Sequence, residues 1–319
     1  MAIVDVTRPA FNGVMLGAES ESMVDSLVIP PPLAPGDVVA VIAPSSPFPP
    51  DELWRGLAWL RTRYRIRIHP GVLERDGYLA GGDERRRGEL ERALRDPDAK
   101  AIVAVRGGYG ALRVTDDAIW GELVRRPRWV VGFSDVTVLL AMAWRAGVAA
   151  VHGPNVTGLG PAASPSVRAA WLAALERPTA PRVWRGLRVL HGGRARGPLV
   201  GGNLAIVHAL AAAGRLDVPR GAVLALEDVT EAPYRVDRML TALHLGGHLG
   251  RASAIVFGGF DRCGPGPDGR TVDEVLEERT RTLGIPVLGG APFGHSANNE
   301  AFVVGLPAVV RDDEVHLAT

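Results

Sequence analysis

Ser134 stands where a β-branched apolar run gives way to a helical pattern, in the stretch "WVVGFSDVT" (129–137). A serine at a strand-to-helix turn exposes its hydroxyl above a helix N-terminus, which favours developing negative charge and suits a nucleophile. The Gly-x-Ser-x-Gly pattern is not met, because Val136 follows Asp135. Ser and Asp are also preferred helix N-caps. The spacing alone favours capping and leaves the nucleophile as the alternative.

A glycine-rich turn, "RGGYG" (106–110), follows the apolar run "AIVAV". Glycines let backbone N–H groups approach a ligand, as an anion-binding turn or an oxyanion hole requires. The alternative is an ordinary tight turn. No Lys-Ser or Lys-Thr follows, so the turn is not a P-loop, and the third glycine of a dinucleotide-binding fingerprint is missing.

A serine nucleophile needs a base, and the chain has eight histidines. His208 and His244 fall inside helical patterns, where packed or surface side chains are expected. His152 in "VHGPN" and His295 in "GGAPFGHSANN" instead follow strands. Because catalytic residues concentrate in loops after strands, these two are the candidate bases.

A carboxylate must orient that base, and "AVLALEDVTEAP" offers three. Glu227 ends an apolar strand and is expected to be partly buried at the sheet edge. Glu231 precedes Pro233, a residue favoured in the first helical turn, and belongs to a helix start. Glu227 is therefore the better candidate, with a structural role as the alternative.

Metal and cofactor chemistry has little support in the sequence. His244 and His248 lie one helical turn apart but lack a third ligand, and no HExxH or paired-Cys spacing occurs. Cys263, the single cysteine, has no partner for an internal disulfide, which favours a reducing compartment. We expect no metal and no cofactor.

The composition is that of an ordinary globular enzyme, with 47% hydrophobic and 22% charged residues and a net charge of +1. The arginines are scattered, so nucleic acid is not an expected partner. Runs such as Arg85-Arg86-Arg87 are expected on solvated helix faces. No apolar run approaches a membrane span, and the first residues do not resemble a secretory signal.

The candidate residues must be positioned by alternating elements. From 37 to 153, strands are expected at 38–43, 65–69, 101–105, 129–133 and 149–152, separated by amphipathic helices. This alternation predicts a doubly wound, mainly parallel sheet, an α/β fold whose ligands bind at the carboxyl ends of the strands. The candidate turns all follow such ends.

The whole chain is predicted to consist of four parts: an extension, two domains and a linker between them. Residues 1–30 form an extension of uncertain order, 31–160 the N-terminal α/β domain, and 161–181 a linker with one short helix. Residues 182–319 form a smaller α+β domain carrying the Glu and the His, with helices at 203–213, 234–247 and 271–283. Seven short strands are expected there: "RVWRGLRVL", "AVLALED", "SAIVFGG", "PVLGG", "AFVVG", "AVVRD" and "EVHLA".

Seven motifs in order resemble the LD-carboxypeptidase family of serine peptidases. They are "GDVVAVIAPSSP", "RGGYGALR", "GFSDVT", "HGPN", "GGNLA", "LEDVTEAPYRVDRML" and "GHSANN", spread over residues 35 to 310. The resemblance implies a flavodoxin-like or amidotransferase-like N-terminal domain and a C-terminal domain with a swivelling β-barrel-like core. The active site is expected between them.

The resemblance also implies the roles of the candidate residues. Ser134 is the expected nucleophile, His295 the base and Glu227 its orienting carboxylate. The backbone N–H groups of Gly108 and Asp135 are the expected oxyanion hole. No cofactor is implied, and a cytoplasmic homodimer without nucleic-acid or membrane partners is expected.

Further residues are candidates for substrate binding: Gly107, Tyr109 and Asn203. The helix after Ser134 is expected to be supported by Asp135 or the backbone around it.

The substrate stays open between members of the family. The favoured hypothesis is release of terminal D-Ala from a murein tetrapeptide. The alternatives are cleavage of an aminoacyl- or peptidyl-nucleotide antibiotic, as in self-immunity, and a biosynthetic acyl transfer or amidase reaction through the same acyl-enzyme. A non-hydrolytic peptide-binding relative is the hypothesis from another class.

Overall fold

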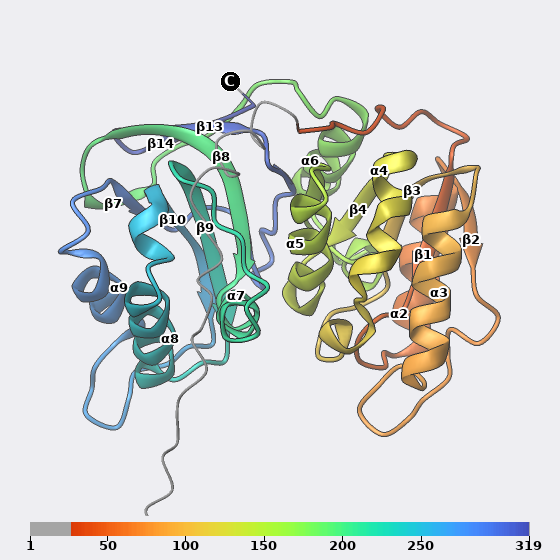
Figure 1. The fold of residues 1–319 in the computed structure, drawn as a ribbon, viewed down its shortest axis with the longest axis horizontal. Coiled ribbons are helices and arrows are strands. Elements are labelled where there is room, and N and C mark those ends of the chain that lie inside the picture. The colour runs from red at the N-terminus through yellow and green to blue at the C-terminus, as the bar shows by residue number, and fades with distance from the viewer. Residues whose placement is uncertain (1–26, 319) are drawn as a thin grey trace, which may run out of the picture.

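The computed structural model describes residues 27–318, so most of the predicted extension over 1–30 lies outside the described residues. Its strands form two sheets, one in each half of the molecule, with helices packed around them (Figure 1). This arrangement confirms the predicted α/β fold with a second, sheet-containing domain. Within the described residues no helix is both long and apolar enough to cross a membrane.

The first sheet has the strand order β12-β5-β4-β3-β1-β2. Five of its strands run parallel to their neighbours, and β12 (Phe302–Val304) pairs antiparallel with β5 at the edge. The parallel order 2-1-3-4-5 is that of flavodoxin-like sheets. The five strands are β1 (Val38–Ile42), β2 (Arg65–Ile68), β3 (Ala99–Ala104), β4 (Trp129–Gly132) and β5 (Ala150–His152).

Helices cover both faces of this sheet because successive strand residues point to opposite sides. Val39 packs in one apolar cluster with Leu57 and Trp171, from two helices of one face. Ala40 packs in the other cluster, which includes Leu90 of the opposite face. The helices are α2 (Pro50–Arg61), α3 (Asp83–Arg95), α4 (Gly121–Arg125), α5 (Thr137–Arg145) and α6 (Pro165–Glu176).

The second sheet has the order β6-β14-β13-β8-β9-β10-β11-β7. Its edge strands β6 (Arg182–Trp184) and β7 (Arg188–His191) are joined by only three residues, 185–187. Three residues and their flanking bonds span roughly 14 Å, so the sheet must curl until its edges approach each other. That curl gives the barrel-like core. The other strands are β8 (Arg194–Asn203), β9 (Ala222–Val229), β10 (Ala252–Asp261), β11 (Val287–Gly289), β13 (Pro307–Arg311) and β14 (Glu314–Leu317).

Three helices accompany the second sheet close to their predicted positions: α7 (Leu204–Ala212), α8 (Pro233–Leu245) and α9 (Val272–Thr280). Pro233 is the first residue of α8, as its preference for the first helical turn predicts. A Thr271–Glu274 capping box starts α9.

The structure departs from the sequence-based organisation in three segments. The predicted linker contains α6, whose Trp171 and Leu175 are buried in the core of the first sheet, so it is an integral part of the N-terminal half. Strand β12, predicted within the C-terminal domain, joins the first sheet. The ten-residue β8 was not predicted, because its glycines, among them Gly201 and Gly202, obscure the strand pattern.

Candidate active site

Ser134 lies at a tight turn between β4 and α5. It has φ of 64°, in the left-handed region that non-glycine residues rarely adopt, which displays the side chain at a sharp elbow. The Phe133 N–H donates to Asn155 Oδ1 at 3.3 Å, which ties the elbow to the loop after β5. A Cβ on Gly132 would lie 2.6 Å from Val136 Cγ1, so this close turn requires glycine.

The glycine-rich turn after β3 lies directly against Ser134. A Cβ on Gly107 would lie 2.8 Å from Ser134 Oγ and 3.3 Å from Asp135 N. Gly108 has φ of +107°, and within residues 27–318 its N–H has no hydrogen-bond acceptor. The structure therefore brings the predicted oxyanion residues, Gly108 and Asp135, beside the predicted nucleophile, together with Gly107.

The Asp135 side chain does not cap the following helix. It is buried, and its Oδ2 accepts the Ala111 N–H at 2.8 Å, beyond the glycine-rich turn. Neither α5 nor the short turn before it has a side-chain cap. Burial raises the pKa of the Asp135 carboxyl, against the hydrogen bond from Ala111. Its carboxylate is thus used to hold the turn that carries Gly108.

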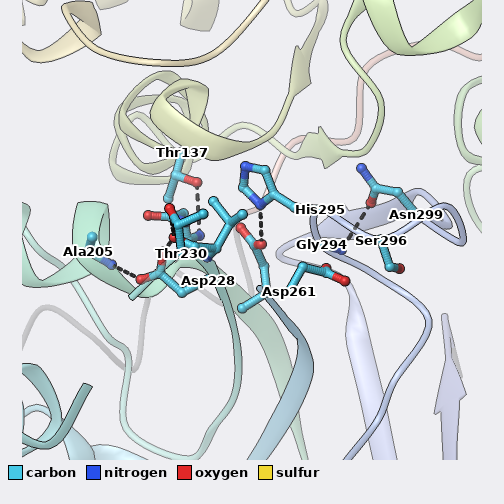
Figure 2. Close-up of polar contacts among 12 residues, drawn as sticks. Thr137, Ala205, Asp228, Thr230, Asp261, Gly294, His295, Ser296 and Asn299 are labelled. Carbon is cyan, nitrogen blue, oxygen red and sulfur yellow. Dashed lines mark hydrogen bonds and ion pairs between the residues drawn. The ribbon is translucent and has the colours of Figure 1, made fainter. Parts of the chain in front are cut away.

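Glu227 and His295 form the second part of the site. His295 Nδ1 lies 2.7 Å from Glu227 Oε2, a contact that the dashed line from the His295 ring marks in Figure 2. The Glu227 side chain is fully buried in β9, two residues before its last residue. A Cβ on Gly294 would lie 3.0 Å from Glu227 Oε2 at a φ of +120°, so glycine allows this approach. The Gly294 N–H donates to Asn299 Oδ1 at 3.2 Å, which braces the loop carrying His295.

The two parts meet through Phe133. The Phe133 and His295 rings have centroids 4.8 Å apart, so the imidazole lies beside the residue that precedes the nucleophile. No hydrogen bond joins Ser134 to His295 among the described residues. A base whose Nδ1 is held by a buried carboxylate, next to a displayed serine, has the composition of an acyl-transfer site.

Asn203 lies behind Glu227, as its cross-strand partner in the register of β8 and β9. Its Oδ1 accepts the Ile206 N–H at 3.2 Å, which caps α7, and its Nδ2 donates to Asp228 Oδ1 at 3.0 Å. Each end of this amide thus makes one hydrogen bond within the chain, which fixes its orientation. Burial, then the charge of Glu227, raises the pKa of Asp228 to about 6, against the hydrogen bonds that Asp228 accepts.

Tyr109, the third candidate for substrate binding, has a 51% exposed side chain. Its ring contacts that of Tyr78, which is 64% exposed, with centroids 5.7 Å apart. The Tyr109 N–H donates to Ser46 Oγ at 3.0 Å, so the backbone is fixed while the ring faces outward. The pair forms an exposed aromatic surface at the catalytic turn.

His152, the alternative base, lies in the core. Its ring stacks on Phe302 at 4.7 Å and contacts Phe293 and Phe133 edge-on at 5.6 and 6.0 Å. It is fully buried, and neither ring nitrogen has a partner among the described residues. Burial, then the neighbouring charge of His295, lowers the pKa of His152 to about 3. His152 is therefore neutral and has no exposed proton-accepting atom.

Several residues that support the site were missed in the sequence. Ser46, Asn155 and Asn299 each hold a loop of the site by a side-chain hydrogen bond. The only signal for the two asparagines was their place in loops after strands. Arg86, expected on a solvated face, is instead fully buried. Among the described residues, no group of three or more His, Cys, Asp or Glu side chains could hold a metal ion.

Comparison with known proteins identifies the family of this chain. The family models for the LD-carboxypeptidase N-terminal and C-terminal domains match residues 39–153 and 196–310. The chain belongs to the LD-carboxypeptidase family. As a member, it is a serine-type carboxypeptidase.

Relatives and solved structures support this assignment over most of the chain. The murein tetrapeptide carboxypeptidase of Pseudomonas aeruginosa is 36% identical over 290 residues, covering 87% of this chain and 94% of that protein. The muramoyltetrapeptide carboxypeptidase of Oxalobacter formigenes has a crystal structure with a TM-score of 0.78 at 28% identity, covering 88% of this chain and 97% of that one. MccF in complex with glutamyl sulfamoyl guanosine has a TM-score of 0.83 at 20% identity, covering 92% and 98%, which shows a shared fold.

Proposed function

We propose that this LD-carboxypeptidase releases the terminal D-Ala of a murein tetrapeptide through an acyl-enzyme on Ser134. The observation that carries the proposal is the 2.7 Å contact of His295 Nδ1 with buried Glu227, beside a serine elbow lined by glycines. The substrate class is supported by the 36% identical relative named for murein tetrapeptide. In this proposal His295 is the base and Glu227 orients it.

The reaction proceeds in two steps. His295 Nε2 takes the Ser134 proton as Oγ attacks the amide carbonyl, while the Glu227 carboxylate accepts a hydrogen bond from Nδ1–H and stabilises the imidazolium. His295 then gives the proton to the departing D-Ala amine, and water hydrolyses the ester. A Ser134–His295 hydrogen bond is expected to form when substrate is bound, since such bonds tighten in the substrate complex.

The oxyanion of each step is proposed to bind the N–H groups of Gly108 and Asp135. Gly108 N has no acceptor within the described chain, and Asp135 N lies in the turn Ser134–Val136 that leads into α5. Each such donor contributes roughly 3–4 kcal/mol to the transition state in comparable sites. Gly107 gives the substrate backbone access to Ser134, and Tyr109 is proposed to contact the distal part of the substrate.

A second candidate function is cleavage of an aminoacyl-nucleotide conjugate. The observation that favours it is the exposed Tyr78–Tyr109 pair beside the turn, because aromatic faces stack on nucleobases. In the same family fold, MccF binds glutamyl sulfamoyl guanosine. A cytoplasmic location, a homodimer and an acyl acceptor other than water stay predictions from the sequence.

Product analysis tests the proposal. The protein is incubated separately with a murein tetrapeptide, with an aminoacyl sulfamoyl adenosine, and with the tetrapeptide plus an amine acceptor. The products are identified by mass spectrometry. We expect the tetrapeptide to lose one D-Ala, and S134A to lose both this activity and labelling by a fluorophosphonate. S166A, on the exposed face of α6, is the matched serine control and keeps both. Cleavage of the adenosine conjugate alone would support the second candidate, and unchanged activity of S134A would reject the mechanism.

A further inference from the structure

Arg86 is a charged side chain buried at the catalytic edge of the first sheet. It lies on α3 with no exposed surface, and burial lowers the pKa of its guanidinium. Its Nε donates to Gly81 O at 3.1 Å, and its Nη1 donates to Gly110 O at 2.9 Å and to Pro44 O. Its Nη2 pairs with Asp83. A buried charge is costly unless its donors are used, so these contacts explain how Arg86 is tolerated.

Two acceptors of Arg86, the carbonyls of Pro44 and Gly110, belong to segments that hold the glycine-rich turn. Pro44 follows β1, and two residues later Ser46 contacts the turn twice: Ser46 N donates to Gly107 O at 3.2 Å, and Ser46 Oγ accepts from Tyr109 N at 3.0 Å. Gly110 ends the turn itself. Arg86 therefore ties the turn to the loop that supports it.

These contacts occupy two N–H donors, and within the described residues they leave the N–H of Gly108 available, like those of Gly107 and Gly110. The Tyr109 N–H is taken by Ser46, and the Ala111 N–H by Asp135 Oδ2 at 2.8 Å. Gly108 lies between Gly107 and Tyr109, and its N–H has no acceptor among residues 27–318. The direction of the Gly108 N–H is thus set by the positions of its tied neighbours.

The contact between Arg86 and Gly110 is close. A Cβ on Gly110 would lie 2.7 Å from Arg86 Nη1, and Gly110 has φ of +129°. Glycine is needed here for the carbonyl to reach the guanidinium. A planar guanidinium can span several carbonyls at fixed angles, whereas a lysine ammonium presents its donors from a single point.

We propose that Arg86 is a positioning residue for the oxyanion hole: by clamping the Pro44 and Gly110 carbonyls, it aims the Gly108 N–H at the reacting carbonyl. This inference rests on the proposed function, in which Gly108 binds the oxyanion. Arg86 touches neither Ser134 nor the substrate in this account. It acts on the transition state through the turn, so its loss changes kcat rather than substrate affinity.

The test compares R86K with R128K. Arg128 is a matched control, because it is 2% exposed and donates to the carbonyls of Ala93 at 2.9 Å and Asp96 at 2.6 Å. It lies next to the start of β4, at the opposite edge of the sheet from the turn. D-Ala release gives kcat and KM for each variant, and titration of the uncleaved tetrapeptide against S134A and S134A/R86K gives its affinity. Thermal unfolding gives the folded fraction.

We expect R86K to lower kcat about 100-fold, since a shift of about 1 Å in a group that acts on the transition state, here the Gly108 N–H, has that effect. The affinity for the tetrapeptide should stay within about twofold of the wild type. R128K should keep kcat within about twofold for the folded protein, even where its unfolding temperature falls. Should R86K fail to fold, R86Q, which removes the buried charge, is measured in its place with the same expectation.

A folded R86K or R86Q with the wild-type kcat would overturn the inference, as would equal losses of kcat in the Arg86 and Arg128 variants. Failure of the proposed function is distinguishable, because it would appear in the wild type as absence of Ser134-dependent D-Ala release.

Discussion

Replacing His152 by Phe is expected to make folding less sensitive to acid. His152 is fully buried without a hydrogen-bond partner in the described chain, and its pKa is lowered from 6.5 to about 3, chiefly by burial. Below pH 6.5 the unfolded chain binds a proton that the folded protein does not bind until about pH 3. The unfolded state then binds more protons, so stability falls as the pH falls through this range.

The size of the effect follows from the two pKa values. At pH 5 the solution is about 1.5 units below the ordinary histidine pKa, and each unit corresponds to about 1.4 kcal/mol. His152 alone should therefore reduce the free energy of unfolding by about 2 kcal/mol between pH 7 and pH 5. Asp228, with a pKa raised to about 6, acts in the opposite direction, but it is present in both proteins and cancels in the comparison.

The assay is urea denaturation of the wild type and H152F at pH 7 and pH 5. Phe keeps the ring that stacks on Phe302 and removes the titration. The absolute stability of H152F does not affect the test as long as the variant folds, because only the change in the free energy of unfolding between the two pH values is compared. The urea m-values of the two proteins must agree. The wild type should lose about 2 kcal/mol more than H152F on acidification. Equal losses in the two proteins would refute the assignment of a neutral, acid-labile His152.

Two further predictions concern the catalytic groups. E227Q should lower kcat by about 10³- to 10⁴-fold with little change in KM, because the amide does not hold the His295 tautomer or stabilise the imidazolium. A kcat within tenfold of the wild type in steady-state assays would argue against this role of Glu227. G107A should slow fluorophosphonate labelling of Ser134 about 100-fold, since the new Cβ would lie 2.7 Å from Ser134 Cβ. G121A, with no atom within 4 Å of the new Cβ, is its control, and equal labelling rates would contradict the close approach.

The sequence predicted much of the first sheet because β1, β3, β4 and β5 contain apolar runs that end at polar or glycine-rich turns, whereas β2 alternates Arg and Ile. The same rule placed Ser134, Glu227 and His295 at strand ends, and the structure bears this out for Ser134 after β4. For Glu227 the prediction of a partly buried strand end was wrong, because β9 continues to Val229 and the side chain is fully buried. Their catalytic roles stay predictions. The strand-end rule worked because it depends on local patterns of hydrophobicity.

The features that were missed depend on contacts between distant segments. Arg86 has the sequence environment of a solvated helix face, yet its acceptors Pro44 and Gly110 lie 42 and 24 residues away. The contacts of Asn203 with Ile206 and Asp228 were likewise not visible in its motif, and its role toward substrate stays a prediction. No local pattern contains this information, since burial of these polar groups is decided by which loops close over them.

The position of His295 is explained by how its loop joins the two sheets. Residues 290–301 leave β11 in the second sheet and enter β12, which pairs with β5 in the first. Because Glu227 belongs to the second sheet and Ser134 follows the first, a loop anchored in both can present one imidazole to each. A further link runs from Asn203 N to Thr137 Oγ1 at 3.1 Å, between β8 and the helix after the nucleophile. The edge strand β12 therefore anchors the C-terminal end of the His295 loop to the sheet that displays Ser134.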